Sequence, residues 1–353
     1  MEGQGIIVLP SKDLSEDIKF FRNIGFCQDQ IYPADNPVFS VLSAYGLTLR
    51  IDKGAYVFPP TIHILTQNPD KLTKKLSSGN TAPNGTMVKV LPKLTEIHIP
   101  QPAQKFEVTH LNESDSWVVG RAGMLYRDLV PSRMGGALIA SHIRLPNDGP
   151  VHDMVHYHKV MFQLIYCYKG WVKVLYEDQG KPLTLYPGDC VIQPPEIRHQ
   201  VLECGDGFQV IEIGVPAQHM TTFDHHLQLP TVEYRPQREF SDQVFCHHQA
   251  KNAVWELKNG FNICNTGIYK ATKGVASVII AKPAYSSEVH SNHDCNIHFT
   301  FVLKGKTELR VEDSGSSILS EADAFVVPPN MAFVFCNYSN DLKLLQVSLS
   351  PGI

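Results

Sequence analysis

The chain has 353 residues, of which 43% are hydrophobic and 19% are charged, and its formal net charge is −4. Lys and Arg are scattered along the sequence, so the charge pattern favours neither nucleic acid nor an anionic membrane surface as a partner. No basic start precedes a long apolar core, and apolar runs such as VASVII are too short to span a bilayer. We therefore expect no signal peptide and no transmembrane segment.

The cysteines and the turn residues indicate the redox state of the thiols and the fold class. The eight cysteines lie far apart and form no CxxC pair, which is typical of reduced, buried thiols in a cytoplasmic protein. Gly and Pro, 24 residues each, punctuate short β-rich runs. This pattern predicts a mainly β chain with many strands and turns.

Residues 1–90 have the pattern of a small α+β module. GIIVLP predicts a strand, SEDIKFFRNIGF a helix capped by Ser15, and PVFSVLSAYG and GLTLRID two further strands. Strand and helix recur at residues 61–76. The β-α-β-β-β order resembles one module of the glyoxalase/vicinal-oxygen-chelate fold, whose members bind metal through His and Glu. Here only His63 stands in a comparable place, without a carboxylate partner, so we expect a non-catalytic module.

Residues 77–106 are rich in Gly, Pro, Ser and Asn and predict a loop, which ends in a linker at 91–106.

An internal repeat organises the rest of the chain. GWVKVLYED at 170–178 matches GKTELRVED at 305–313, and CVIQPP matches AFVVPP at nearly the same offset. Each unit is dense in strands. The repeat predicts two tandem β-barrels, at 107–226 and 243–353, joined by a linker at 227–242.

Residues 149–170, GPVHDMVHYHKVMFQLIYCYKG, contain three histidines within seven positions of a segment with high β-propensity. Because side chains at i and i+2 of a strand point to the same face, His156 and His158 aim together. Gln163 begins the next strand, and His199 follows a Pro-Pro corner in YPGDCVIQPPEIRHQV. If these strands lie side by side, three imidazoles and one amide oxygen converge, a set that suits a first-row divalent ion.

These residues resemble the two sequence motifs of the cupin superfamily. Residues 149–170 resemble the first motif, with HxHx4Q, Gln163 where glutamate is usual, and Gly170 as the closing glycine. The second motif is represented by Gly188, Pro194, Glu196 and His199. Glu196 stands where glycine is usual. The resemblance covers about residues 107–350 and implies two cupin (double-stranded β-helix) barrels, with His156, His158, Gln163 and His199 as metal ligands in the first.

A glutamine ligand has consequences for the chemistry. An amide cancels none of the metal's charge, so the ion would attract anionic oxygen ligands and acidify bound water. By resemblance we expect Fe(II), with Mn, Ni or Zn as alternatives. Gln163 cannot act as a base, so a proton-transfer group must lie elsewhere. The catalytic candidates are His142 and Arg144, which share a face of a predicted strand, and Glu196.

The second barrel has lost part of this pattern. The aligned residues are Ser291 for His156, His293 for His158, His298 for Gln163 and Phe333 for His199. Without the last-strand histidine we expect no metal there and a structural role for this barrel.

Three functions remain open at this point. The first is an O2-using dioxygenase that acts on a small organic acid or enol. The second is a non-oxidative isomerase or lyase that acts on a sugar acid of the uronate type, with the metal as Lewis acid. The third is a metal- or ligand-binding bicupin without catalysis, and this one would lead if the first barrel were filled by side chains. The resemblance also implies a small anionic substrate and a homodimer.

Overall fold

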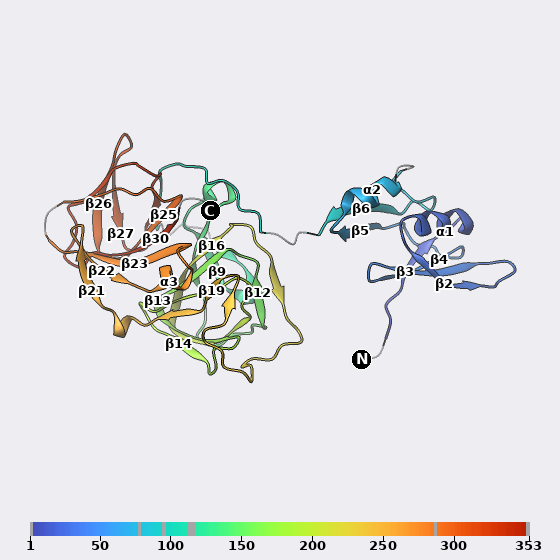
Figure 1. Cartoon of the computed structure of the whole chain (residues 1–353), viewed down its shortest axis with the longest axis horizontal. Helices are drawn as coiled ribbons and strands as arrows, with labels where there is room; N and C mark the ends of the chain where they lie inside the picture. Colours follow the sequence, from blue (N-terminus) through green and yellow to red (C-terminus); the bar gives the residue numbers. More distant parts are fainter. Residues whose placement is uncertain (1–2, 77–78, 94–96, 112–116, 286–287, 351–353) are drawn as a thin grey trace. The chain divides into compact units, whose positions relative to one another are not determined.

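The computed structural model divides the chain into two compact units, Met1–Glu96 and Ile97–Ile353. Figure 1 shows the secondary structure of each unit. The structure describes residues 3–76, 79–93, 97–111, 117–285 and 288–350. Among these, no helix is both long and apolar enough to cross a membrane.

The N-terminal unit contains a four-stranded sheet in the order β1-β4-β3-β2. Its elements are β1 (Ile7–Pro10), α1 (Leu14–Asn23), β2 (Cys27–Tyr32), β3 (Phe39–Ala44) and β4 (Leu47–Asp52). Leu14 and Phe21 of α1 pack with Leu42 and Leu49 of the sheet in one apolar cluster, so the helix covers one face. The β-α-β-β-β order agrees with the sequence pattern, and the glyoxalase resemblance stays a prediction.

Helix α1 begins earlier than its predicted cap. The side chain of Asp13 accepts hydrogen bonds from the backbone N–H groups of Ser15 and Glu16, at 3.0 and 3.2 Å. Asp13 is therefore the N-cap, and Ser15 lies inside the first turn. The prediction of Ser15 as the cap is wrong, because either side chain suits this position and the sequence alone does not choose between them.

A strand was also missed in the predicted loop at 77–106. Strand β6 (Met87–Pro92) pairs in parallel with β5 (Thr61–Thr66), which carries the exposed His63. The connection holds the short helices α2 (Pro69–Thr73) and η1 (Lys74–Leu76). The surrounding Gly, Pro and Asn residues hid a strand of only six residues from the compositional argument.

The first barrel of the C-terminal unit is an 11-stranded sheet. Its strands are β8 (Val118–Val119), β9 (Leu125–Asp128), β10 (Ile139–Arg144), β11 (Gly149–Pro150), β12 (His156–His158), β13 (Phe162–Tyr176), β14 (Leu183–Leu185), β15 (Cys190–Ile192), β16 (His199–Val215), β17 (Thr221–Phe223) and β20 (Cys246–His248). Two short 3-10 helices connect its first strands: η2 (Arg121–Gly123) lies between β8 and β9, and η3 (Arg133–Gly136) lies between β9 and β10.

The longest strand pairing of this barrel is the antiparallel pair β13–β16. Midway along it, Gly170 adopts φ +64°, and a Cβ there would lie 2.4 Å from the carbonyl oxygen of Gly205. Only glycine fits so close an approach. Gly170, the closing glycine of the first sequence motif, is therefore required for the bend of β13 and does not itself position the candidate ligands.

The second barrel consists of a seven-stranded and a four-stranded sheet. The first contains β7 (Glu107–Thr109), β21 (Trp255–Lys258), β22 (Phe261–Asn265), β23 (Ala276–Pro283), β25 (Ile297–Lys304), β28 (Ala324–Val326) and β30 (Lys343–Leu349), and the second β24 (Val289–Ser291), β26 (Lys306–Val311), β27 (Gly315–Ser320) and β29 (Phe333–Cys336). The remaining elements are the hairpin of β18 (Glu239–Phe240) and β19 (Gln243–Val244), η4 (Ala250–Asn252) and α3 (Ile268–Ala271). The chain is thus mainly β, as the sequence predicts.

The two barrels exchange edge strands. Strand β7, which precedes the first barrel in the chain, pairs with β28 of the second, and β20, which precedes the second barrel, pairs with β15 of the first. One buried apolar cluster contains residues of both, among them Leu164 and Ile211 with Phe299 and Phe301. The predicted boundaries at 107–226 and 243–353 stay a prediction, and the shared core indicates that the barrels fold as one unit.

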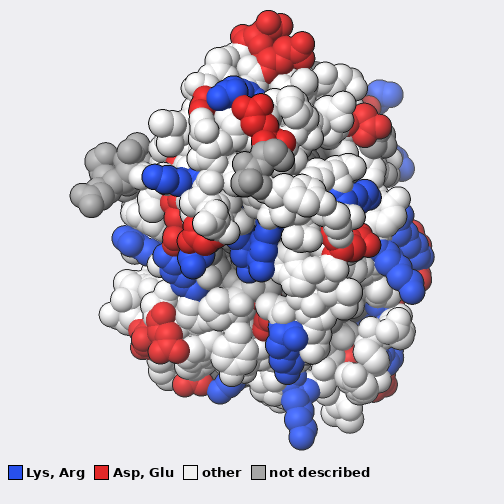
Figure 2. Space-filling view, turned by 90° about the vertical axis from the view of Figure 1, so that its left-hand side faces the viewer, with Lys and Arg blue, Asp and Glu red and all other residues white. Residues whose placement is uncertain are grey.

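The charged side chains on the face shown in Figure 2 are of both signs and interspersed, without one dominant basic patch on that face.

Replacing Phe301 by Ala tests the shared core. The Phe301 side chain is fully buried, and its ring lies 5.3 Å from that of Tyr168 and 6.0 Å from that of His142, both in the first barrel. Removal of such a side chain costs about 3–5 kcal/mol. We expect that loss in urea denaturation, with one common transition for both barrels. The exposed Ile318→Ala is the control, and a loss below about 1 kcal/mol for Phe301→Ala would contradict a shared core.

Candidate metal centre

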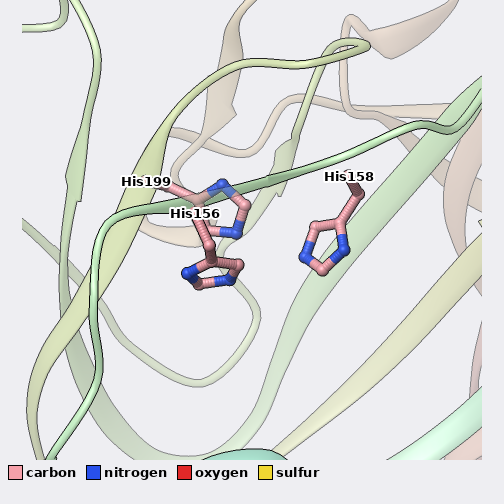
Figure 3. Close-up of side chains that lie close together, drawn as sticks. All are labelled: His156, His158 and His199. Atoms are coloured by element: carbon pink, nitrogen blue, oxygen red, sulfur yellow. The ribbon is translucent and has the colours of Figure 1, made fainter. Parts of the chain in front are cut away.

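Three histidines meet where β12 and β16 pair. His156 lies directly opposite His199 in this pairing, and His158 lies two residues beyond His156 on the same face of β12. Ring centroids are 4.2 Å apart for His156 and His199 and 5.2 Å apart for His158 and His199. The rings point toward one another (Figure 3), and one ligand nitrogen from each lies within 4.8 Å of the others.

Hydrogen bonds orient each imidazole. Nδ1 of His156 lies 2.8 Å from the carbonyl oxygen of Met154, and Nδ1 of His199 lies 3.0 Å from that of Ile197. A carbonyl only accepts, so both rings carry their proton on Nδ1 and leave Nε2 with a free lone pair. Nδ1 of His158 lies 2.9 Å from the hydroxyl oxygen of Thr221 on β17. A histidine that binds a metal through one ring nitrogen typically has its other ring nitrogen hydrogen-bonded to a group of this kind.

Burial keeps these imidazoles neutral. It lowers the pKa of His158 to about 2, with the neighbouring His156 adding to the effect. It also lowers the pKa of His156 and of the almost fully buried His199. Neutral imidazoles are the form that binds a metal, so no proton has to leave these side chains at neutral pH.

Gln163 is buried on β13, with 1% of its surface exposed, and it lines the same cavity of about 60 Å³ as His158. Its Nε2 donates a hydrogen bond of 2.5 Å to Oε1 of Glu212 on β16. Among the described residues, neither Gln163 Oε1 nor His156 Nε2 has a hydrogen-bond partner. Two buried acceptors without partners fit a bound cation, which would satisfy both.

Two carboxylates lie close to the histidine cluster, and the sequence did not reveal either of them. Glu212 lines the cavity, and Asp153, whose side chain is 1% exposed, has Oδ1 3.7 Å from Nδ1 of His156 and forms an ion pair with Arg121. Tyr126 lies in the same cavity, and burial, with the charge of Glu212 adding to it, raises its pKa to about 12. The inward direction of Glu212 follows from its register with β13, which the sequence alone does not give.

A larger cavity, of about 390 Å³, adjoins the first. Four residues line both cavities: Arg121, Tyr126, His158 and Glu212. His219, whose ring centroid lies 5.5 Å from that of His158, and Ser141 line the larger one. The histidines therefore lie beside a space that can take a small molecule, and the first barrel is not filled by hydrocarbon at this end.

The structure does not bring the three predicted catalytic residues to this cavity. His142 and Arg144 lie on the face of β10 opposite Ser141, because strand side chains alternate, and they line a separate cavity of about 620 Å³. Glu196 is exposed and occupies a turn at φ +62°. That backbone conformation is the reason why glycine is usual at this position of the motif.

His142 has a satisfied, enclosed environment. Its Nε2 lies 2.8 Å from Oε1 of Gln209 and its Nδ1 lies 3.2 Å from a guanidinium nitrogen of Arg127. Arg127 also donates to the carbonyl oxygen of Ala322 in the second barrel, at 2.7 Å. His142 is thus part of a network that ties the two barrels together.

The second barrel repeats the frame of the first without its histidine cluster. Ser291 lies opposite Phe333, as His156 lies opposite His199, and His298 lies opposite Ser348, as Gln163 lies opposite Gly214. His298 uses Nδ1 to contact the Ser348 hydroxyl at 2.9 Å. Phe333 packs with Phe325 and Phe335 inside the barrel. Among the described residues, only His156, His158 and His199 form a group of three candidate ligands from His, Cys, Asp and Glu.

The amino-acid sequence matches no family model and no curated protein. The structure, however, is similar to solved structures at low sequence identity. Oxalate decarboxylase from Bacillus subtilis superposes with a TM-score of 0.52 at 14% identity, over 74% of this chain and 79% of that one. A variant of salicylate 1,2-dioxygenase from Pseudoaminobacter salicylatoxidans gives 0.51 at 14%, over 73% and 87%. The protein Ylba from E. coli gives 0.51 at 10%, over 72% and 94%.

These solved structures are cupin-family proteins. The fold of this chain is a cupin fold. The cupin resemblance of the sequence motifs is thereby confirmed at the level of fold, and the histidine cluster lies in the cupin barrel that carries both motifs.

The neutral state of His142 predicts a pH-dependent stability. Burial lowers its pKa to about 4 in the folded protein, against about 6.5 in an unfolded chain. Below pH 6.5 the unfolded state therefore binds a proton that the folded state does not, and stability falls as the pH falls. We expect the free energy of unfolding to drop by about 1.5 kcal/mol more in wild type than in His142→Gln between pH 6.5 and 5. Urea titrations at both pH values check this, and equal pH dependence would contradict it.

Proposed function

We propose that His156, His158, Gln163 and His199 bind one divalent transition-metal ion and that the protein is a metal-dependent cupin enzyme. The observation that carries the proposal is the convergence of three neutral imidazoles whose Nδ1 atoms are already hydrogen-bonded. The unpartnered Gln163 Oε1 supports it as a fourth donor. Iron(II) is the proposed ion, and Mn, Ni and Zn suit the same nitrogen and oxygen donors.

The charge balance supports a small anionic substrate. Four neutral ligands would leave the ion its full positive charge, which attracts carboxylate or enolate oxygens. Arg121 at the junction of the two cavities adds a positive group, although Asp153 partly balances it. Two of the similar structures are named for oxalate and salicylate, both carboxylates. The cavity of about 390 Å³ is large enough for a substrate of that size.

For the reaction, we propose that the enzyme uses O2 as a dioxygenase. When bound, the ion would supply Lewis acidity and, as Fe(II), one-electron chemistry with O2. The chain's own groups would hold the substrate in the cavity of about 390 Å³, and the apolar side chains of Ile143, Val172 and Val210, which line the adjoining cavity of about 60 Å³, would exclude water there. One of the similar structures is a salicylate 1,2-dioxygenase, which supports this reaction class.

Tyr126 and Glu212 favour a second candidate, a non-oxidative isomerase or lyase. Tyr126 is a protonated phenol at neutral pH, its pKa being raised further to about 12, and Glu212 lies in the same cavity. A proton donor beside a carboxylate suits proton transfer on a sugar acid without O2. The purely binding function depended on a filled barrel, and the two cavities beside His158 count against it. The homodimer and the cytoplasmic location stay predictions.

Metal analysis tests the proposed ion site. Protein purified without chelators is expected to contain about one equivalent of transition metal per chain, because a neutral buried three-histidine site binds such ions. His158→Ala removes one donor and is expected to lose most of that metal. His63→Ala, at an exposed position of the N-terminal unit, is the control. Equal metal content in wild type and His158→Ala would rule out the site.

Oxygen consumption separates the two reaction classes. Protein loaded with Fe(II) is mixed with a panel of small carboxylates, including salicylate and a uronate, in an oxygen electrode. A dioxygenase consumes O2 in step with substrate loss, and His158→Ala is expected to lower that rate by roughly 100-fold or more, because the ion that it helps to hold supplies the chemistry. Turnover of a uronate without O2 uptake would instead establish the isomerase or lyase.

A further inference from the structure

We infer that Glu212 is a positioning residue for the metal centre: it holds the Gln163 carboxamide so that Oε1, and not Nε2, faces the cavity. This inference rests on the proposed metal site, because it assigns the group that makes an amide usable as the fourth ligand. Nothing in the cupin motifs marks Glu212, which lies 13 residues beyond His199 on β16.

The strand register brings the two side chains together. Gln163 lies opposite Gly214 and Ile165 lies opposite Glu212 in the β13–β16 pair. Glu212 is two residues from Gly214, so its side chain emerges on the same face as Gln163. Gly214 has no side chain to separate them. The two residues are therefore diagonal neighbours inside the barrel.

The hydrogen bond fixes which end of the amide is available. A carboxylate only accepts, so the group that lies 2.5 Å from Glu212 Oε1 must be the NH2 end of Gln163. If the amide were turned over, two oxygens would face each other at that distance. Oε1 of Gln163 is thus the end of the amide turned away from Glu212; it has no partner among the described residues, and Gln163 lines the same cavity as His158.

The same bond changes the charge at the ligand atom. A hydrogen bond to an ionised carboxylate is stronger than one between neutral groups and polarises the amide. Polarisation draws electron density toward Oε1, which makes it a better donor to a cation than an isolated amide. Glu212 thus lends part of the effect of a carboxylate ligand while the ligand itself stays neutral.

The second barrel offers an internal comparison. Gln346 occupies the place of Glu212, because it lies opposite Thr300 as Glu212 lies opposite Ile165. There the ligand position holds His298, which bonds to Ser348. The acidic residue thus occurs in the barrel that has the glutamine and the histidine cluster.

A double-mutant cycle read by Co(II) binding tests the inference on the full chain. Co(II) alone is the probe, and affinity is measured by competition titration in wild type, Gln163→Leu, Glu212→Leu and the double variant. Loss of an outer partner of a metal ligand typically costs about 10–100-fold in affinity, so we expect that loss for Glu212→Leu. If Glu212 acts through Gln163, the double variant binds no more weakly than Gln163→Leu.

Further variants separate orientation from charge and from folding. Glu212→Gln keeps an acceptor for the Gln163 amide, so we expect it to restore part of the affinity lost in Glu212→Leu. Glu203→Gln is the matched control: Glu203 lies on β16, as Glu212 does, and its half-exposed side chain forms an ion pair with Lys173 of β13. The absorption bands of bound Co(II) are expected to change in Glu212→Leu but not in Glu203→Gln, and thermal melting of each variant reports whether it is folded.

The outcomes distinguish the inference from the proposed function. Co(II) affinity in Glu212→Leu equal to wild type, or losses that add fully in the double variant, would overturn the positioning role while leaving the metal site in place. If wild type itself binds no Co(II), the proposed function fails and the inference fails with it.

Discussion

The pairing of β12 with β16 is the constraint on which the site depends. It places His156 opposite His199, and the short strand β12 then adds His158 from the same face. The main-chain carbonyls of Met154 and Ile197 hold Nδ1 of two of these rings. Because these orienting groups belong to the backbone, the fold sets the direction of Nε2 in His156 and His199, and little rotamer freedom of these two rings remains to be lost when an ion binds.

The charge around these histidines is arranged in two layers. The inner layer, three imidazoles and one amide, is neutral, which burial enforces by lowering the imidazole pKa values. The outer layer contains two carboxylates, of which Asp153 is paired with Arg121 and Glu212 with the Gln163 amide. The buried Asp153 and the half-buried Glu212 thus each have a partner of their own. A cation bound by the inner layer would add a positive charge that these two pairs do not already balance.

The sequence predicted those side chains of the site whose positions depend on neighbouring residues, and it did not reveal those whose positions depend on the register between strands. The HxHx4Q spacing, Gly170 and the Pro-Pro corner predicted the side chains of the cluster, because strand alternation and turn chemistry act over a few residues. The sequence did not reveal that His142 and Arg144 line a cavity separate from that of the histidines, because which side of β10 faces which cavity depends on its pairing with β16. Their catalytic role stays a prediction. Glu212 was missed for the same reason, since its closeness to Gln163 comes from residues 49 positions apart.

The two barrels show how one frame can keep or lose a site. The pairs His156–His199 and Ser291–Phe333 occupy the same register positions, so the backbone of the second barrel could still present ligands there. Phe333 instead joins Phe325 and Phe335, and their packing gains apolar burial where a metal cavity would need polar space. The second barrel thus has an apolar cluster where the first has its histidines, and the two barrels exchange edge strands through β7 and β20. Its contacts with the first barrel, from the Ala322 carbonyl to Arg127 and from the Phe301 ring to His142, lie on the side of β10 away from the histidine cluster.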